Sequence, residues 1–262
     1  MTKVVFGPAG LGPVKDAIKN LEIYHKLGLK ACEIAFTYSV YIGKDDAKKI
    51  GDVAKKLGIK LSIHAPYFVN LNSKEKEKQE NSKKRILKCL EIGTVLGATC
   101  VVFHPGFYGK SSKEETYEKI KDNLLELEKI RKEKKYTPKL APETMGKINV
   151  FGSIEEISRL VKDTGCFACI DFAHILARSG GDYRLYETLE LFKNLKEFHI
   201  HFSGIIYGDK GEKKHRDTLK PEWESLLNHL PRNKNVVIIN ESPNMIEDAL
   251  NGKEIYENKL CN

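Results

Sequence analysis

Six short apolar runs of the chain each end in a side chain that can donate an electron pair to a metal ion. In chain order these residues are His64, His104, Glu143, Asp171, His201 and Glu241. Imidazole and carboxylate donors together suit zinc, and also manganese or iron, better than magnesium, which prefers oxygen ligands and water. Three carboxylates are more than one tetrahedral ion needs, so the set predicts at least two metal ions with a carboxylate able to bridge them.

Two further histidines are candidates for the same cluster. His174 follows Asp171 by three positions, and on the turn after a strand this spacing directs both side chains to the same side. His215 lies in the charged stretch DKGEKKHRDTLK, which we interpret as a long loop after the seventh apolar run. Both side chains are therefore predicted to join the metal cluster.

The other histidines examined and the cysteines are interpreted as structural. His25 and His229 fall inside helical segments, and His199 shares the strand face of His201 one layer deeper, where it would pack or support a ligand. The C-x-x-C pattern in GCFACIDF overlaps an apparent buried strand. Six scattered cysteines in a chain of this size are expected to be reduced thiols.

Regular elements must position the six donors, and short runs rich in Val, Ile and Phe, typical of buried strands, recur along the chain. The expected strands are 3–7, 31–36, 60–64, 99–104, 139–143, 167–171, 197–202 and 235–241. The segments between them have helical spacing, which predicts helices at 13–27, 44–57, 73–96, 112–134, 153–162, 185–193, 221–230 and 244–256. Ser153 and Glu156 form a capping-box pattern, and Gly58 and Gly97 are typical helix terminators.

Eight strand–helix pairs in alternation predict a closed parallel (β/α)8 TIM barrel, as a single domain over residues 1–262. The alternative, a doubly wound open sheet, usually has a G-x-G-x-x-G turn after its first strand. Here the first strand runs into GPAGLGP, which has glycines in the wrong context. In a barrel the carboxyl ends of the strands meet at one mouth, so six consecutive strands would point their donors into one volume.

Composition limits the functional classes only broadly. The 262 residues carry 44 basic and 36 acidic side chains, and the net charge of +8 favours polyanionic partners. No window approaches the ~18 apolar residues of a membrane span, so no membrane partner is expected. The first residues, MTKVVFGPAG, lack the features of a secretory signal, which predicts a cytoplasmic protein.

The motifs around the donors resemble those of the endonuclease IV family, zinc-dependent apurinic/apyrimidinic (AP) endonucleases built on the xylose isomerase-like barrel. The likeness spans nearly the whole chain and is carried by HAPYFVN at 64–70, HPG at 104–106, ETMG at 143–146, DFAH at 171–174 with a following GGD, HFSG at 201–204, and Glu241. It implies a hydrolase that cuts the phosphodiester 5′ to an abasic site in double-stranded DNA, in base excision repair. It also implies a monomer with two or three zinc ions, or manganese, and no organic cofactor.

The resemblance assigns the donors to three ions. The first would be held by His64 and His104, with Glu143 bridging to a second; the second would also be held by Asp171, His201 and Glu241. The third would be held by His174 and His215. The family places an aspartate two residues before the last histidine, but this chain has Lys213 there, and a charged ammonium cannot bind a metal. Three nearby carboxylates are candidates to replace it after a register shift: Glu212, Asp217 and Asp209.

The loop after the third strand holds two aromatic residues, Tyr67 and Phe68, where the family has a Tyr-Leu pair. The resemblance implies that they bind DNA as an apolar wedge in the minor groove that fills the stack left by a flipped nucleotide. The alternative interpretation is that both pack beneath the next helix. Asn70 is a candidate to hold this loop in place.

Two other functional classes stay open. A sugar isomerase or epimerase of the same superfamily would use one ion bound by Glu143, Asp171, His201 and Glu241, with Glu143 and Glu241 as the catalytic residues that move protons. A nucleic-acid-binding protein that kept the barrel but lost turnover is the third class. His104, the D-x-x-H pattern and the basic charge favour the endonuclease.

Overall fold

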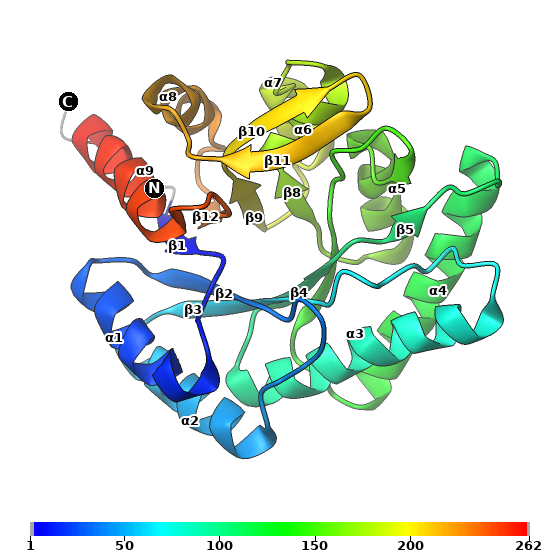
Figure 1. Ribbon diagram of the computed structural model, residues 1–262, viewed down its shortest axis with the longest axis horizontal. Helices are drawn as coiled ribbons and strands as arrows, with labels where there is room; N and C mark the ends of the chain where they lie inside the picture. The colour runs from blue at the N-terminus through cyan, green and yellow to red at the C-terminus, as the bar shows by residue number, and fades with distance from the viewer. Residues whose placement is uncertain (1–2, 261–262) are drawn as a thin grey trace.

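The computed structural model describes residues 3–260, and its centre is a ring of parallel strands surrounded by helices (Figure 1). The parallel strands are β1 (Lys3–Pro8), β2 (Ala31–Ala35), β3 (Lys60–His64), β4 (Cys100–Phe103), β6 (Lys139–Pro142), β8 (Cys169–Asp171), β9 (Glu197–Phe202) and β12 (Asn235–Asn240). They form two four-stranded sheets, in the orders β1-β12-β9-β8 and β2-β3-β4-β6.

Backbone hydrogen bonds join the two sheets at both edges. The Lys30 amide donates to the Phe6 carbonyl at 3.0 Å, which links β2 to β1. The Phe167 amide donates to the Leu140 carbonyl at 2.9 Å, and a parallel bridge pairs Glu143 with Cys169, which together link β8 to β6. The eight strands therefore follow one another around a barrel, and the predicted (β/α)8 fold is confirmed.

The helices cover the outside of the strands, and their buried residues pack against the barrel. They are α1 (Ala17–Lys26), which follows a short 3-10 turn η1 (Val14–Asp16), α2 (Lys44–Leu57), α3 (Lys76–Leu96), α4 (Lys113–Glu133), α5 (Ile154–Thr164), α6 (Phe172–Ser179), α7 (Leu185–Leu191), α8 (Lys220–His229) and α9 (Met245–Leu260). The capping box of Ser153 and Glu156 is confirmed, as are the left-handed helix ends at Gly58 and Gly97. None of the helices within residues 3–260 is long and apolar enough to cross a membrane.

Alternation along the strands builds the barrel interior in layers. The predicted donors lie in the layer nearest the mouth. In the layer below, Glu33 pairs with Ser62 across β2 and β3, and Cys169 pairs with His199 across β8 and β9. The prediction that His199 lies one layer beneath His201 is therefore confirmed.

Two elements near the mouth differ from the prediction. The sequence predicts a single helix at 185–193 after β8, but the chain turns directly into α6, whose first turn is capped by the Asp171 carboxylate accepting from the His174 amide at 2.7 Å. The stretch predicted as a long loop is instead a hairpin of β10 (Gly204–Gly208) and β11 (Gly211–Arg216), which lies against α6 (Figure 1). A second, short antiparallel pair joins β5 (Gly106–Phe107) to β7 (Val150–Phe151).

Candidate metal centre

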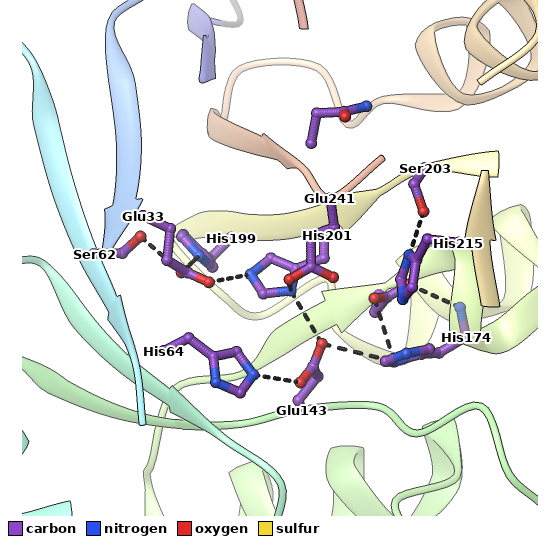
Figure 2. Close-up of polar contacts among 12 residues, drawn as sticks. Glu33, Ser62, His64, Glu143, His174, His199, His201, Ser203, His215 and Glu241 are labelled. Atoms are coloured by element: carbon purple, nitrogen blue, oxygen red, sulfur yellow. Dashed lines mark hydrogen bonds and ion pairs between the residues drawn. The ribbon is translucent and has the colours of Figure 1, made fainter. Parts of the chain in front are cut away.

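The predicted donors meet at the mouth of the barrel, where Figure 2 shows most of them, and six of the eight line a cavity of about 320 Å³. All eight side chains predicted to bind metal come from the carboxyl ends of strands, or from α6 and β11 just beyond them. Together with Glu212, these side chains form three groups, and the donor atoms within each group lie within 4.8 Å of one another. The groups are His64, His104 and Glu143; then Glu143, Asp171, His201 and Glu241; and then His174, Glu212 and His215.

Glu143 stands between the groups and belongs to two of them. Its Oε2 atom lies 3.3 Å from His64 Nε2 and 3.2 Å from His104 Nε2, while its Oε1 atom lies 3.0 Å from His201 Nδ1. Burial alone would raise the pKa of Glu143, but the surrounding imidazoles hold this pKa well below its ordinary value. An ionised carboxylate that offers one oxygen to each side has the geometry of a bridging ligand.

The ring nitrogens that face away from the cavity are held by other protein groups. His64 Nδ1 donates to the Ala65 carbonyl at 2.7 Å, and His174 Nδ1 donates to the Thr144 carbonyl at 3.0 Å. With Nδ1 engaged in this way, Nε2 points to the cavity side, beside Glu143 in the case of His64 and beside Glu212 in the case of His174, and is the nitrogen that a metal would bind. A partner on the outer nitrogen that fixes the ring and its tautomer is the usual arrangement of metal-binding histidines.

Asp171 offers an independent test of whether the cavity suits a cation. Its Oδ1 atom caps α6, whereas its Oδ2 atom is buried, accepts no hydrogen bond among the described residues and lies 3.2 Å from His174 Nδ1, a nitrogen already bonded to the Thr144 carbonyl. Burial raises the pKa of Asp171 to about 8, and the negative charges of Glu143 and Glu241 add to this effect. A buried carboxylate oxygen without a donor is costly unless a cation satisfies it, so the donor set fits a bound metal.

Glu33 on β2 is a component of the site that sequence reasoning missed. It is fully buried, and its Oε1 atom lies 2.9 Å from His201 Nε2, the nitrogen opposite the one that faces Glu143 (Figure 2). Its Oε2 atom accepts from the Ser62 hydroxyl at 2.7 Å and lies 3.0 Å from His199 Nε2. Burial would raise the pKa of Glu33, but the two imidazoles lower it, so Glu33 is an anion that supports His201 from below. The only signal in the sequence was a glutamate inside the apolar run ACEIAF.

A β-bulge in the hairpin decides which carboxylate joins the third group. The register runs regularly from Arg216 to Lys214, but Tyr207 then pairs with Glu212, which leaves Lys213 as an extra residue. In an unbroken ladder Lys213 would share the face of His215; the bulge puts Glu212 there instead. Glu212 Oε2 consequently lies 3.4 Å from His174 Nε2.

The other candidates for this position lie elsewhere. Lys213 is exposed on the outer side of the hairpin, where its side chain runs beside Gly208. Asp209 is exposed in the hairpin turn, and Asp217 accepts a hydrogen bond from the Asn244 amide at 2.9 Å. Of the three carboxylates considered from the sequence, only Glu212 therefore reaches the cavity.

His215 completes the third group from the second strand of the hairpin. Its Nδ1 atom lies 2.6 Å from the Ser203 hydroxyl, so Nε2 is the nitrogen that a metal would bind. The hairpin is held close to the mouth because Gly211 adopts a left-handed backbone with φ of 89° and forms a bridge with Lys147. A Cβ at position 211 would collide with the Gly146 carbonyl oxygen, so only glycine permits this approach.

Tyr67 and Phe68 lie on the rim of the mouth and do not pack beneath the next helix. Their exposed fractions are 48% and 59%. The Tyr67 ring stacks on the His104 imidazole with 5.5 Å between centroids. Asn70 holds the loop as anticipated, because its side-chain oxygen accepts from the amides of Asn72 and Phe107.

A further donor group joins His201 to Cys169 and His199, which lie in the layer beneath the mouth. Burial raises the pKa of the Cys169 thiol well above its ordinary value, so the sulfur is protonated. His199 is also occupied by Glu33. The C-x-x-C pattern thus remains a structural feature in this fold.

Comparison with known proteins gives the same fold and several relatives. The family model described as xylose isomerase-like TIM barrel matches residues 21–258. An uncharacterized protein of Methanocaldococcus jannaschii is 41% identical over 224 residues, which cover 81% of each chain. A probable endonuclease 4 of Mycoplasma genitalium is 28% identical over 216 residues, covering 76% of this chain and 72% of the relative.

Solved structures of several kinds share the architecture. The SacUVDE structure superposes with a TM-score of 0.75 at 17% identity and 99% coverage of both chains. Endonuclease IV from Thermus thermophilus has a TM-score of 0.72 at 21% identity and 98% coverage of both. A D-tagatose 3-epimerase-like protein has a TM-score of 0.72 at 22% identity, with 99% of this chain and 97% of that chain covered.

These matches agree with the resemblance to endonuclease IV that the motifs indicated, and they also include sugar epimerases. The family match covers most of the chain, and the barrel with donors at its mouth agrees with it. The chain belongs to the xylose isomerase-like TIM barrel family.

Proposed function

We propose that the protein is a metal-dependent AP endonuclease that hydrolyses the phosphodiester 5′ to an abasic site in double-stranded DNA. The observation that carries this proposal is the third donor group, His174, Glu212 and His215, which adds to the four ligands that a one-metal sugar isomerase would use. The curated relatives named probable endonuclease 4 and the net charge of +8 support the same substrate. The resemblance to endonuclease IV extends the proposal to a monomeric enzyme.

The residues of the three groups would hold two or three zinc ions, with manganese as the alternative. Bound zinc would supply a Lewis acid for the charge that develops on the phosphate and would acidify a nearby water. Glu143 stays ionised between the groups and fixes their spacing. Glu241 is 18% exposed, and the His201 charge keeps its pKa low, at about 2, against the effect of burial. Glu241 is thus an anion that water can reach, suited to accept a hydrogen bond from the attacking water and orient it.

Tyr67 and Phe68 would bind the DNA beside the cleaved bond. Tyr67 is braced by His104 and lines the metal cavity, whereas Phe68 projects farther and contacts Tyr38 at 6.0 Å between centroids. An exposed aromatic pair on a fixed loop can enter the minor groove without first becoming ordered. This supports the role as a wedge for both residues.

The test is cleavage of a duplex that carries one tetrahydrofuran abasic analogue, with and without a chelator. We expect a single nick 5′ to the analogue that leaves a 3′-hydroxyl, and we expect chelation to abolish it. His215→Ala should lower the rate strongly, whereas the matched His229→Ala, which removes a surface imidazole bonded to the Ser225 carbonyl, should not.

A sugar epimerase is the second candidate, favoured by the likeness to the D-tagatose 3-epimerase-like structure and by the group Glu143, Asp171, His201 and Glu241. In that case Glu143 and Glu241 would move a proton at the substrate carbon. Metal-dependent turnover of a ketohexose, with no nicking of the abasic duplex, would establish the epimerase. Tight binding of the duplex without either reaction would instead indicate a protein that has lost turnover.

A further inference from the structure

A second cavity adjoins the metal centre and shares one wall with it. It has a volume of about 410 Å³ and lies between the loop after β3, the first turns of α3 and β5. Tyr67 lines both cavities, so the second opens directly beside the reacting centre. We call this cavity the side groove; the residues used below are Phe68, Asn81, Arg85 and Phe107.

The apolar part of the side groove consists of two phenylalanines held by a rigid frame. Phe68 and Phe107 are 59% and 48% exposed. The Asn72 amide group donates to the Phe107 carbonyl at 2.8 Å, and the Asn70 backbone amide donates to the Ser82 hydroxyl at 3.0 Å. The two rings are therefore presented in a fixed arrangement, and covering them would cost little ordering entropy.

The polar part of the side groove has unused bonding capacity. Arg85 is half-buried in α3, and within residues 3–260 its guanidinium makes no hydrogen bond or ion pair. The same is true of the Asn81 side-chain amide one turn earlier. A partly desolvated cation without an anion is unfavourable, so the groove is complementary to a ligand that brings negative charge.

We propose that the side groove binds one unpaired nucleotide of the DNA substrate, next to the position that is cleaved. The base would stack on the exposed phenylalanine faces, the Asn81 amide would meet its edge, and Arg85 would bind the adjoining phosphate. Aromatic faces with an unpaired guanidinium suit a nucleotide and have no counterpart in recognition of a single small sugar in the metal cavity. This inference rests on the proposed function, because it adds a subsite to the same substrate.

The probe for the side groove is a fluorescein-labelled, single-stranded thymidine hexamer, titrated by anisotropy into the full-length, metal-loaded protein. Phe107→Leu keeps apolar bulk but removes the flat face, and we expect it to raise Kd by roughly tenfold, since base stacking contributes at that level. A hexamer of abasic spacers should bind more weakly than the thymidine hexamer to the wild type, and equally weakly to wild type and variant. A hexamer without bases that binds as tightly as thymidine would overturn the proposal.

The phosphate contact has its own measurement. Arg85→Gln should reduce the slope of log affinity against log salt by about 0.7, the value expected for one phosphate contact on a single strand. Lys56→Gln removes the same charge from the last turn of α2, outside the side groove, and should leave the slope unchanged. Equal slopes for wild type and Arg85→Gln would contradict the phosphate contact. A concentration-dependent dimer that Phe107→Leu dissociates would instead show that a second copy of the chain occupies the side groove, and would also contradict the assignment.

Nicking of the abasic duplex by the same preparations separates this inference from the proposed function. If nicking occurs but both variants bind the hexamer as the wild type does, the side groove assignment is wrong and the nuclease stands. If the variants weaken hexamer binding as described but the wild type never nicks, the nuclease is wrong and the nucleotide site stands.

Discussion

Single side chains set the chemistry of the mouth through atoms that do not face the cavity. Backbone carbonyls hold His64 and His174, the Ser203 hydroxyl holds His215, and the buried Glu33 carboxylate lies behind His201. Each partner fixes a ring orientation before a metal arrives, which lowers the entropy lost on binding. The geometry of the centre is therefore built into the fold.

Glu33 should affect metal binding although it is not a ligand in the proposed scheme. Replacing it by glutamine keeps its size but removes the negative charge beside His201 Nε2, so we expect Glu33→Gln to weaken metal affinity by ~10–100-fold. Competition with a chromogenic chelator measures this. The control is Glu128→Gln, which removes a buried carboxylate paired with Arg131 at 2.9 Å in α4. Unchanged affinity in Glu33→Gln would show that His201 needs no such support.

The third donor group leads to opposite predictions for two adjacent residues, Glu212 and Lys213. Glu212→Gln should lower the metal content by one ion per chain and the nicking rate by at least ~100-fold, since a whole cation is lost. Lys213→Gln, on the exposed side of the bulge, should leave both unchanged. Elemental analysis of the purified variants decides this, and loss of metal in Lys213→Gln alone would reverse the assignment.

The donors could be anticipated at this scale, but their partners could not. His64, His104 and His201 each end an apolar run, and this placement alone predicts where they meet. The choice among Glu212, Asp209 and Asp217 depends on one unpaired residue in a hairpin, which composition does not encode. Glu33 was visible as a charge within an apolar run, but its partners on β3 and β9 come from distant segments.

At the level of elements, ion pairs join neighbouring helices around the barrel. Glu91 of α3 lies 2.7 Å from the Lys44 ammonium at the start of α2 and 2.8 Å from Lys88 within its own helix. These two lysines lower the pKa of Glu91 to about 2. The pair is partly open to solvent, so its contribution to stability is modest.

The Glu91 cluster leads to a pH-dependent expectation. A carboxylate with a lowered folded-state pKa contributes stability above its ordinary pKa of 4.5, and this stability is lost as pH falls through about 2. Glu91→Gln should therefore lower the free energy of unfolding by ~0.5–1 kcal/mol at pH 7, with the difference shrinking below pH 4.5. Urea titrations at several pH values measure it. A constant difference across this range, or one unaffected by 1 M salt, would assign the effect to packing.

Elements with strong local signals were predicted and those set by tertiary contacts were not. Ser153 marks a helix start through its capping side chain and Gly58 a helix end through its left-handed backbone, so the corresponding ends were found. The hairpin β10–β11 is rich in lysine and lacks an apolar alternation, and its position depends on Gly211 meeting the backbone at Gly146. Helix α6 was missed because it begins immediately at the end of β8, with Asp171 serving as both strand end and cap.

At the scale of the whole molecule, the barrel gathers buried carboxylates and imidazoles at one end, the mouth. The buried carboxylates meet there, and Asp171 Oδ2 has no hydrogen-bond donor among the described residues. Strand count and alternation were enough to predict this architecture, because eight apolar runs separated by helical segments have few other solutions. A closed barrel of eight strands requires the first strand to pair with its neighbours on both sides, so the contacts between β1 and β2 are expected from the strand count.

Metal removal should therefore destabilise the entire fold. Ions present at 100 times their Kd contribute about 2.7 kcal/mol per site, so we expect a chelator to lower Tm by roughly 5–10 °C for each ion removed and added zinc to restore it. Differential scanning calorimetry provides the measurement. Glu128→Gln should melt earlier but show the same chelator-induced shift, because it lies outside the centre. Superimposable melting curves with and without chelator would mean that the protein binds no metal at this mouth.

The extra residue at position 213 has a consequence for how this chain is compared with others. In a column-by-column alignment, a lysine would stand opposite an aspartate and the site would be scored as degenerate. In space, the neighbouring Glu212 places its carboxylate beside His174, where it could serve as the acidic donor. Assessments of whether a barrel of this kind has kept or lost its chemistry should therefore superpose donor atoms in three dimensions before counting letters.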